Sequence, residues 1–192
     1  SPDASADVSA DVSPDAVLDG AAPTELPALG PPTIVVPSDR LPAGLDVQIA
    51  NNNLDVVRHA GRRYLAWRTS EWHFASALSE LHVVSRPEDD PEAPFEFETT
   101  VSLGTDVREP RFLSWDGKLF LYFAVLGDNP IDFEPQGAQV TVRGADGQWS
   151  APQPIFDPEF IPWRARVVDG RPELMGYVGG AAIYDPGGRR AG

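Results

Sequence analysis

The chain has 192 residues, and its hydrophobic content of 42% is enough for a substantial core. Its 29 acidic residues against 15 basic ones give a formal net charge of -14 at pH 7, which repels phosphate backbones and argues against a nucleic-acid partner. The sequence has no cysteine, which excludes disulfides, thiolate metal sites and a cysteine nucleophile.

Residues 1–45 are predicted to form a disordered, acidic leader rich in Pro, Asp and Ala. Aspartates recur at every fourth position, and a helix would stack their charges on one face: Asp3, Asp7, Asp11, Asp15 and Asp19. The leader therefore reads as an extended tether, with a tail of no particular role as the alternative. Ile34, Val35 and Val36 are the first residues expected in a strand.

The leader resembles the spacers that follow the lipid-modified cysteine of bacterial surface lipoproteins. The chain begins at Ser1 and its single methionine is Met175, so we expect a removed export signal; a fragment of a longer protein is the alternative. Both points favour a secreted, periplasmic or cell-surface bacterial protein with a lipid anchor upstream. No apolar run approaches the roughly 20 residues that span a membrane.

Residues 46–192 are predicted to form a repeated all-β domain. Three stretches align on a glycine and read as strand, tight turn, strand: LDVVRHAGRRYLAW at Gly61, PRFLSWDGKLFLYF at Gly117 and RARVVDGRPELMGY at Gly170. The first two are followed by a third strand at residues 81–85 or 139–143, and by a fourth at 95–103 or 148–156.

Four antiparallel strands per repeat are typical of a β-propeller blade. The sequence accounts for about two and a half blades, so we expect an incomplete five-bladed propeller that is truncated or completed by self-association. A small β-sandwich is the alternative architecture.

Alternating strand directions should place the long loops 69–79 and 127–137 on the same face as the beginnings of the innermost strands. That face is the predicted site. The candidate binding residues there include the loop side chains Trp72 and His73, and Trp72 could stack on a sugar ring. The other four tryptophans, Trp67, Trp115, Trp149 and Trp163, are expected to pack between blades.

The stretch TDVREPRFLSWDGKLFLYF contains Arg108-Glu109-Pro110 at the start of an inner strand. It resembles the Arg-Asp-Pro block of five-bladed β-propeller glycosidases and the first arginine strand of sialidases, and IPWRARVVDGRPELMGY is similar to later inner strands of those enzymes. The resemblance implies hydrolysis of an extracellular glycan, with Glu109 as the carboxylate that stabilises the transition state and Asp55 as base or nucleophile.

The chain departs from that family at two places: Glu109 replaces an aspartate, and the third inner strand carries Arg164 and Arg166 instead of an acid glutamate. Together with Arg108, these arginines would suit a carboxylated sugar. The alternative for them is a structural salt bridge to Glu109 or Asp55.

A non-catalytic propeller that binds glycan or protein, and a partial chain without activity of its own, are therefore alternatives to the hydrolase. No cofactor is expected. The three histidines lack metal-ligand spacing, and the acidic loop 128–134 is a weak calcium candidate that matches no defined calcium loop.

Overall fold

The structure is a computed structural model that describes residues 28–156 and 158–179. The chain divides into two compact units, Ser1–Thr33 and Ile34–Gly192, and every strand belongs to the second. The described residues form strands and loops without a helix, so the all-β prediction is confirmed for them. Accordingly, this part of the chain holds no helix long and apolar enough to cross a membrane.

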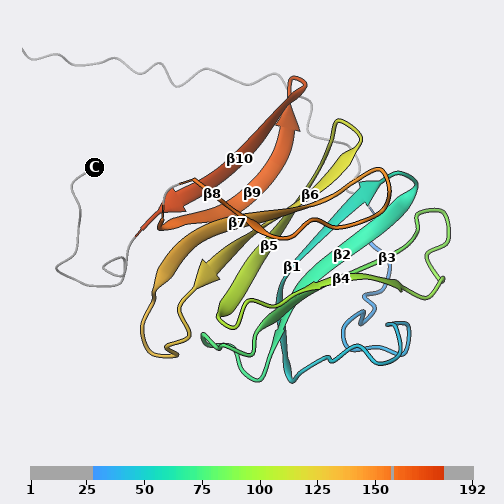
Figure 1. The fold of residues 1–192 in the computed structure, drawn as a ribbon. Coiled ribbons are helices and arrows are strands. Elements are labelled where there is room, and N and C mark those ends of the chain that lie inside the picture. Colours follow the sequence, from blue (N-terminus) through green and yellow to red (C-terminus); the bar gives the residue numbers. More distant parts are fainter. Residues whose placement is uncertain (1–27, 157, 180–192) are drawn as a thin grey trace, which may run out of the picture. The chain divides into compact units, whose positions relative to one another are not determined.

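The strands form three antiparallel sheets in which neighbours along the chain are neighbours in space (Figure 1). The first sheet contains β1 (Ala50–His59), β2 (Arg62–Ser70), β3 (Glu80–Pro87) and β4 (Glu96–Val101). The second contains β5 (Asp106–Trp115), β6 (Lys118–Leu126), β7 (Pro135–Arg143) and β8 (Gln153–Ile155). The third is the two-stranded pair β9 (Phe160–Val168) and β10 (Arg171–Val178). The predicted four-strand repeat is therefore confirmed for two sheets.

The three predicted hairpins share one turn geometry. Positive φ angles occur at both central residues of each turn: Ala60 and Gly61 (47° and 72°), Asp116 and Gly117 (49° and 68°), Asp169 and Gly170 (50° and 75°). Two consecutive residues with positive φ are the mark of a type I′ turn, whose twist matches that of the flanking strands. The glycines that revealed the repeat are thus required by the backbone of each hairpin.

The main core lies between the first and second sheets. From the first sheet it takes Tyr64, Ala66, Leu81, Val83 and Val101, and from the second Val107, Phe112, Leu119, Leu121, Phe123 and Val125. Along β2 these residues alternate with Leu65 and Trp67, which belong to a second cluster on the opposite face of the sheet. Both faces of β2 are therefore buried along its apolar stretch Tyr64–Trp67.

The second cluster is covered by the segment 34–47, which precedes β1. Val35, Val36, Leu41, Leu45 and Val47 pack against it, and Phe95 N donates a hydrogen bond of 2.8 Å to Arg40 O. The expected leader boundary at residue 45 therefore differs from the structure, in which residues 34–45 belong to the folded unit. Ile34, Val35 and Val36 also lie outside the strands: Val35 and Val36 pack against the second cluster without pairing, and Ile34 is exposed. The rest of the leader, up to residue 27, lies outside the described residues.

The first strands of the three sheets, β1, β5 and β9, are neighbours: β1 contacts β5, and β5 contacts β9. A smaller cluster joins the second and third sheets through Ala124, Leu126 and Ile161, with Phe133 and Tyr177 against it. Each sheet thus places its first strand beside the first strand of the sheet before it. Within the described residues the sheets do not close into a ring.

Candidate functional site

Each of the three inner strands is interrupted by a bulge. The register shifts between Asn52 and Asp55 in β1, between Arg108 and Arg111 in β5, and between Met175 and Gly176 of β10 opposite β9. Asn53 and Glu109 have positive φ angles of 46° and 54°, as the extra residues of the first two bulges. A bulge re-aims the side chains that follow it, and bulges are common beside functional sites.

The residue that follows each bulge occupies an equivalent place in its hairpin. Asp55, Arg111 and Arg164 each stand six residues before the turn glycine of their own hairpin. They pair across the strand with Ala66, Tyr122 and Met175. Because β1, β5 and β9 lie beside one another, the repeat brings these three charged side chains together.

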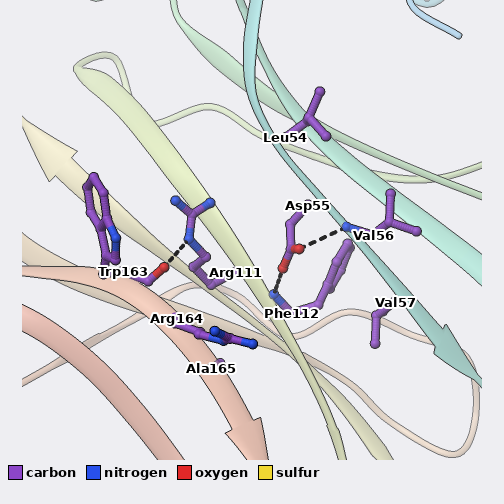
Figure 2. A pocket seen from close by; sticks show the side chains of 9 residues that line it. All are labelled: Leu54, Asp55, Val56, Val57, Arg111, Phe112, Trp163, Arg164 and Ala165. Carbon is purple, nitrogen blue, oxygen red and sulfur yellow. Dashed lines mark hydrogen bonds between the residues drawn. The ribbon is translucent and has the colours of Figure 1, made fainter. Parts of the chain in front are cut away.

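The three side chains line one pocket of about 430 Å³, which lies in the usual size range for ligand pockets (Figure 2). Its lining comes from β1, β5 and β9 and consists of Leu54, Asp55, Val56, Val57, Arg111, Phe112, Trp163, Arg164 and Ala165. We call it the inner-strand pocket.

Two of the three equivalent side chains tie their strand to the next. Asp55 Oδ2 accepts a hydrogen bond of 2.7 Å from Phe112 N, and its Oδ1 accepts one of 2.9 Å from Val56 N. Arg111 Nε donates to Trp163 O at 2.6 Å. Among the described residues, the side chain of Arg164 makes no hydrogen bond or ion pair, and Figure 2 shows it among the residues that line the pocket. The third equivalent position thus offers an unpaired guanidinium to the pocket.

Burial raises the pKa of the Asp55 carboxyl above its ordinary value of 3.8, against the opposing effects of the two backbone N–H donors and of Arg111. The folded protein therefore holds this proton more tightly than the unfolded chain does. It follows that the contribution of Asp55 to stability falls as pH rises from about 3.8 through the raised folded pKa.

We expect this effect to appear in a comparison with Asp55→Asn, measured by urea unfolding across acidic pH. The free energy of unfolding of the variant minus that of the wild type should increase with pH through this window and become constant above it. A difference that does not depend on pH would contradict the raised pKa.

Glu109, the other predicted catalytic carboxylate, is absent from the lining of the pocket. Its Oε1 accepts a hydrogen bond of 2.5 Å from Asn53 Nδ2, and its Oε2 pairs with Arg111 Nη2 at 2.5 Å. Through Asn53 it connects the bulge of β5 with the bulge of β1. Its negative charge neutralises the guanidinium of Arg111, which lines the pocket. Asp55 and Arg111 thus line the same pocket, and Arg111 is paired with Glu109 outside it.

The two other predicted arginines take part in ion pairs elsewhere. Arg108 pairs with the buried Asp106, and Arg166 pairs with Glu173 of β10 at 3.1 Å. Neither lines the inner-strand pocket. The alternative interpretation predicted salt bridges to Glu109 or Asp55, whereas the partners are Asp106 and Glu173.

The predicted loop residues Trp72 and His73 lie between β2 and β3, outside the lining of the pocket. Asn52 Nδ2 lies 3.1 Å from His73 Nδ1 in a hydrogen bond, which ties the loop to the start of β1. As expected from the strand directions, the loop lies at the end of the sheet where β1 begins.

Arg111 and Trp163 were missed as site residues, the latter because it was expected to pack between blades. Trp163 is 58% exposed. Arg111 could have been found by counting back from the turn glycines, since it stands at the same offset from Gly117 as Asp55 does from Gly61.

The acidic loop between β6 and β7 is held by its own hydrogen bonds. Asn129 Nδ2 donates to Asp132 Oδ2 at 2.8 Å, and Gly127 N donates to Glu134 O at 2.8 Å. In the part of the chain that the structure describes, no three His, Cys, Asp or Glu side chains are grouped so that they could hold a metal ion.

No protein-family model and no curated protein matches the sequence. A crystal structure of a protein of unknown function from Dyadobacter fermentans DSM 18053 is similar at 13% sequence identity, with a TM-score of 0.47. The match covers 64% of this chain and 45% of the other, so the chain spans less than half the length of that protein.

Proposed function

We propose that the chain is an extracellular glycan-binding module, and that the inner-strand pocket holds a carboxylated sugar. In this proposal the three sheets are blades of an open propeller-like stack, and the pocket lies where their inner strands meet. Export and surface attachment are part of the proposal, on the basis of the acidic leader alone.

The observation that carries the proposal is the unpaired Arg164. Asp55 and Arg111, at the equivalent positions, are engaged with the backbone of the next inner strand, whereas the Arg164 guanidinium is free within the described residues. A planar guanidinium matches a carboxylate in a two-pronged hydrogen bond. A ligand carboxylate would therefore find its partner at Arg164.

The rest of the lining suits the body of a sugar. Each carboxylate oxygen of Asp55 accepts one backbone hydrogen bond and keeps a lone pair that a hydroxyl group can use. Trp163 is partly exposed at the pocket, and an indole face packs well against the C–H groups of a sugar ring. An anion without hydroxyl groups, such as phosphate, would use only the arginines.

Hydrolysis of the glycan is the second candidate, favoured by the raised pKa of Asp55, which suits a general acid or base. Glycosidases of the common kinds need two carboxyl groups about 5–9.5 Å apart. Asp55 is the one carboxylate in the lining of the pocket, and Glu109 lies outside that lining. Binding without turnover is therefore the primary proposal.

A screen of acidic and neutral glycans, followed by calorimetric titration with galacturonic acid, tests the proposal. We expect Arg164→Ala to weaken binding of the acid by about 10- to 100-fold, since a hydrogen bond to a charged group is worth about 1.5–3 kcal/mol. Arg166→Ala is the matched control, two residues along the same strand and paired with Glu173. It should bind like the wild type.

Acetate and inorganic phosphate serve as competitors that distinguish a bare anion site from a sugar site. Equal displacement of galacturonic acid by acetate, or equal affinity of Arg164→Ala and wild type, would refute the proposed ligand class. Release of reducing ends from a bound glycan, lost in Asp55→Asn, would instead support the hydrolase.

A further inference from the structure

The loop between β2 and β3 exposes two large aromatic side chains close to each other in sequence. Trp72 is 47% exposed and Phe74 is 60% exposed. Exposed tryptophan and phenylalanine side chains on one loop are typical of interaction sites, where aromatic residues are enriched.

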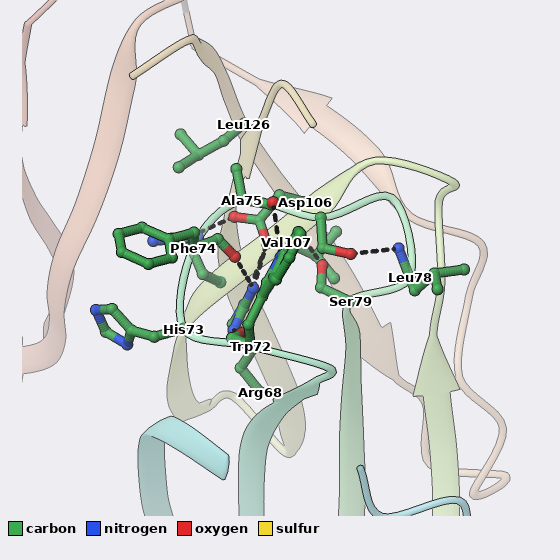
Figure 3. A network of polar contacts seen from close by, with 12 residues as sticks. Arg68, Trp72, His73, Phe74, Ala75, Leu78, Ser79, Asp106, Val107 and Leu126 are labelled. Atoms are coloured by element: carbon green, nitrogen blue, oxygen red, sulfur yellow. Dashed lines mark hydrogen bonds and ion pairs between the residues drawn. The ribbon is translucent and has the colours of Figure 1, made fainter. Parts of the chain in front are cut away.

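The backbone of this loop is fixed from below by a buried guanidinium (Figure 3). Arg68 Nη1 donates to Trp72 O at 3.2 Å, and Arg68 Nη2 donates to Phe74 O at 2.8 Å. The same guanidinium is held by Asp106 Oδ1 at 2.7 Å, and both of these charged side chains are fully buried. Each aromatic residue is therefore anchored through its own carbonyl group.

Further contacts within the loop complete its conformation. The indole Nε1 of Trp72 donates to Ala75 O at 3.2 Å, and Ser76 Oγ donates to Glu71 Oε1 at 3.0 Å. These contacts fix the backbone of the loop and the indole of Trp72 before any partner binds, and a preordered surface loses less conformational entropy on binding.

A chain of hydrogen bonds connects the loop with the inner-strand pocket. His73 is bonded to Asn52 of β1, and the next residue, Asn53, donates to Glu109, which pairs with Arg111 of the pocket. The loop and the pocket are therefore separated by the first residues of β1.

We infer that Trp72 and Phe74 form a second contact platform for the same ligand, which is then an acidic oligosaccharide rather than a single sugar. This inference rests on the proposed function: the pocket takes one carboxylated residue, and the platform takes a neighbouring residue of the glycan. Flat aromatic faces suit the C–H surfaces of sugar rings and need no charge on the second residue.

Calorimetric titration with galacturonic acid and its di-, tri- and tetrasaccharide tests the inference. We expect the affinity of the wild type to increase with chain length by about tenfold, as about 1.4 kcal/mol of added contact would give. Trp72→Ala and Phe74→Ala should lose most of this increase and keep the affinity for the monosaccharide. Trp72→Phe should restore part of it, because the flat ring is retained.

Trp115→Ala is the matched control, since Trp115 is 38% exposed and lies beside the hairpin turn at the far end of β5. It should keep the full dependence on chain length, and circular dichroism should show that all variants fold. Affinity that does not depend on length in the wild type, or an unchanged increase in Trp72→Ala and Phe74→Ala, would refute the platform and leave the pocket intact. Failure of the wild type to bind any member of the series would refute the pocket and the platform together.

Discussion

Asp106→Asn is expected to lower the free energy of unfolding by about 3–5 kcal/mol, because it removes one partner of a buried ion pair. Asp106 joins β2 of the first sheet to β5 of the second through Arg68, and its other oxygen pairs with Arg108. Burial, together with the charge of Arg108, lowers the pKa of Arg68, and Asp106 opposes this shift through its hydrogen bond and its charge. Without the carboxylate, two guanidinium groups lose their partner in a dry environment.

Urea denaturation at neutral pH measures this loss. The matched control is Glu173→Gln, which breaks the half-exposed pair with Arg166 and should cost about 1 kcal/mol or less, as surface ion pairs do. Similar values for the two variants would mean that the Arg68–Asp106 pair contributes no more than a surface contact.

Phe123→Ala should lower the free energy of unfolding by about 3–5 kcal/mol, the usual range for removing a buried aromatic side chain. Phe123 lies on β6, is fully buried, and belongs to the core between the first two sheets. The cavity would open between the first and second sheets. The substitution should therefore weaken the packing of the two sheets against each other as well as the packing of β6.

Phe97→Ala is the control for this change, because Phe97 lies on β4 and is 54% exposed. Surface substitutions of this kind usually alter stability by about 0.5 kcal/mol or less. If both phenylalanine variants unfolded at the same urea concentration, the described core would not be the one that stabilises the protein.

The hairpins were predictable because their turns demand particular residues. Two consecutive positive φ angles favour glycine in the second place, and Gly61, Gly117 and Gly170 repeat at nearly equal spacing. The third and fourth strands were predicted from short apolar runs that follow the first two turn glycines at a similar distance. These signals are local, so they can be recognised in the sequence without knowledge of the tertiary fold.

The site was predicted only in part, because bulges disturb simple alternation. Arg108 and Asp106 are two residues apart in β5 and pair on one face of the strand, whereas Arg111, beyond the extra residue Glu109, faces the pocket. The resemblance to the Arg-Asp-Pro block selected Arg108 and Glu109, whereas a count back from the turn glycine selects Arg111.

Two other features had no local signal. Arg68 and Asp106 are 38 residues apart in sequence, and only the packing of two sheets brings them together. The segment 34–47 packs by scattered apolar residues without a strand period, so its composition resembled that of the leader before it.

The segment 34–47 makes the first sheet different from the second in what covers it. In the second sheet the face that carries Leu121 meets the first sheet, whereas the corresponding face of the first sheet, which carries Leu65, meets residues 34–47. Residues 34–47 thus cover the face of the first sheet that a further sheet would need. A further sheet could pack against this face of the first sheet only if residues 34–47 were displaced. Addition of a sheet or closure of a ring on that side would therefore compete with a contact that the protein already makes.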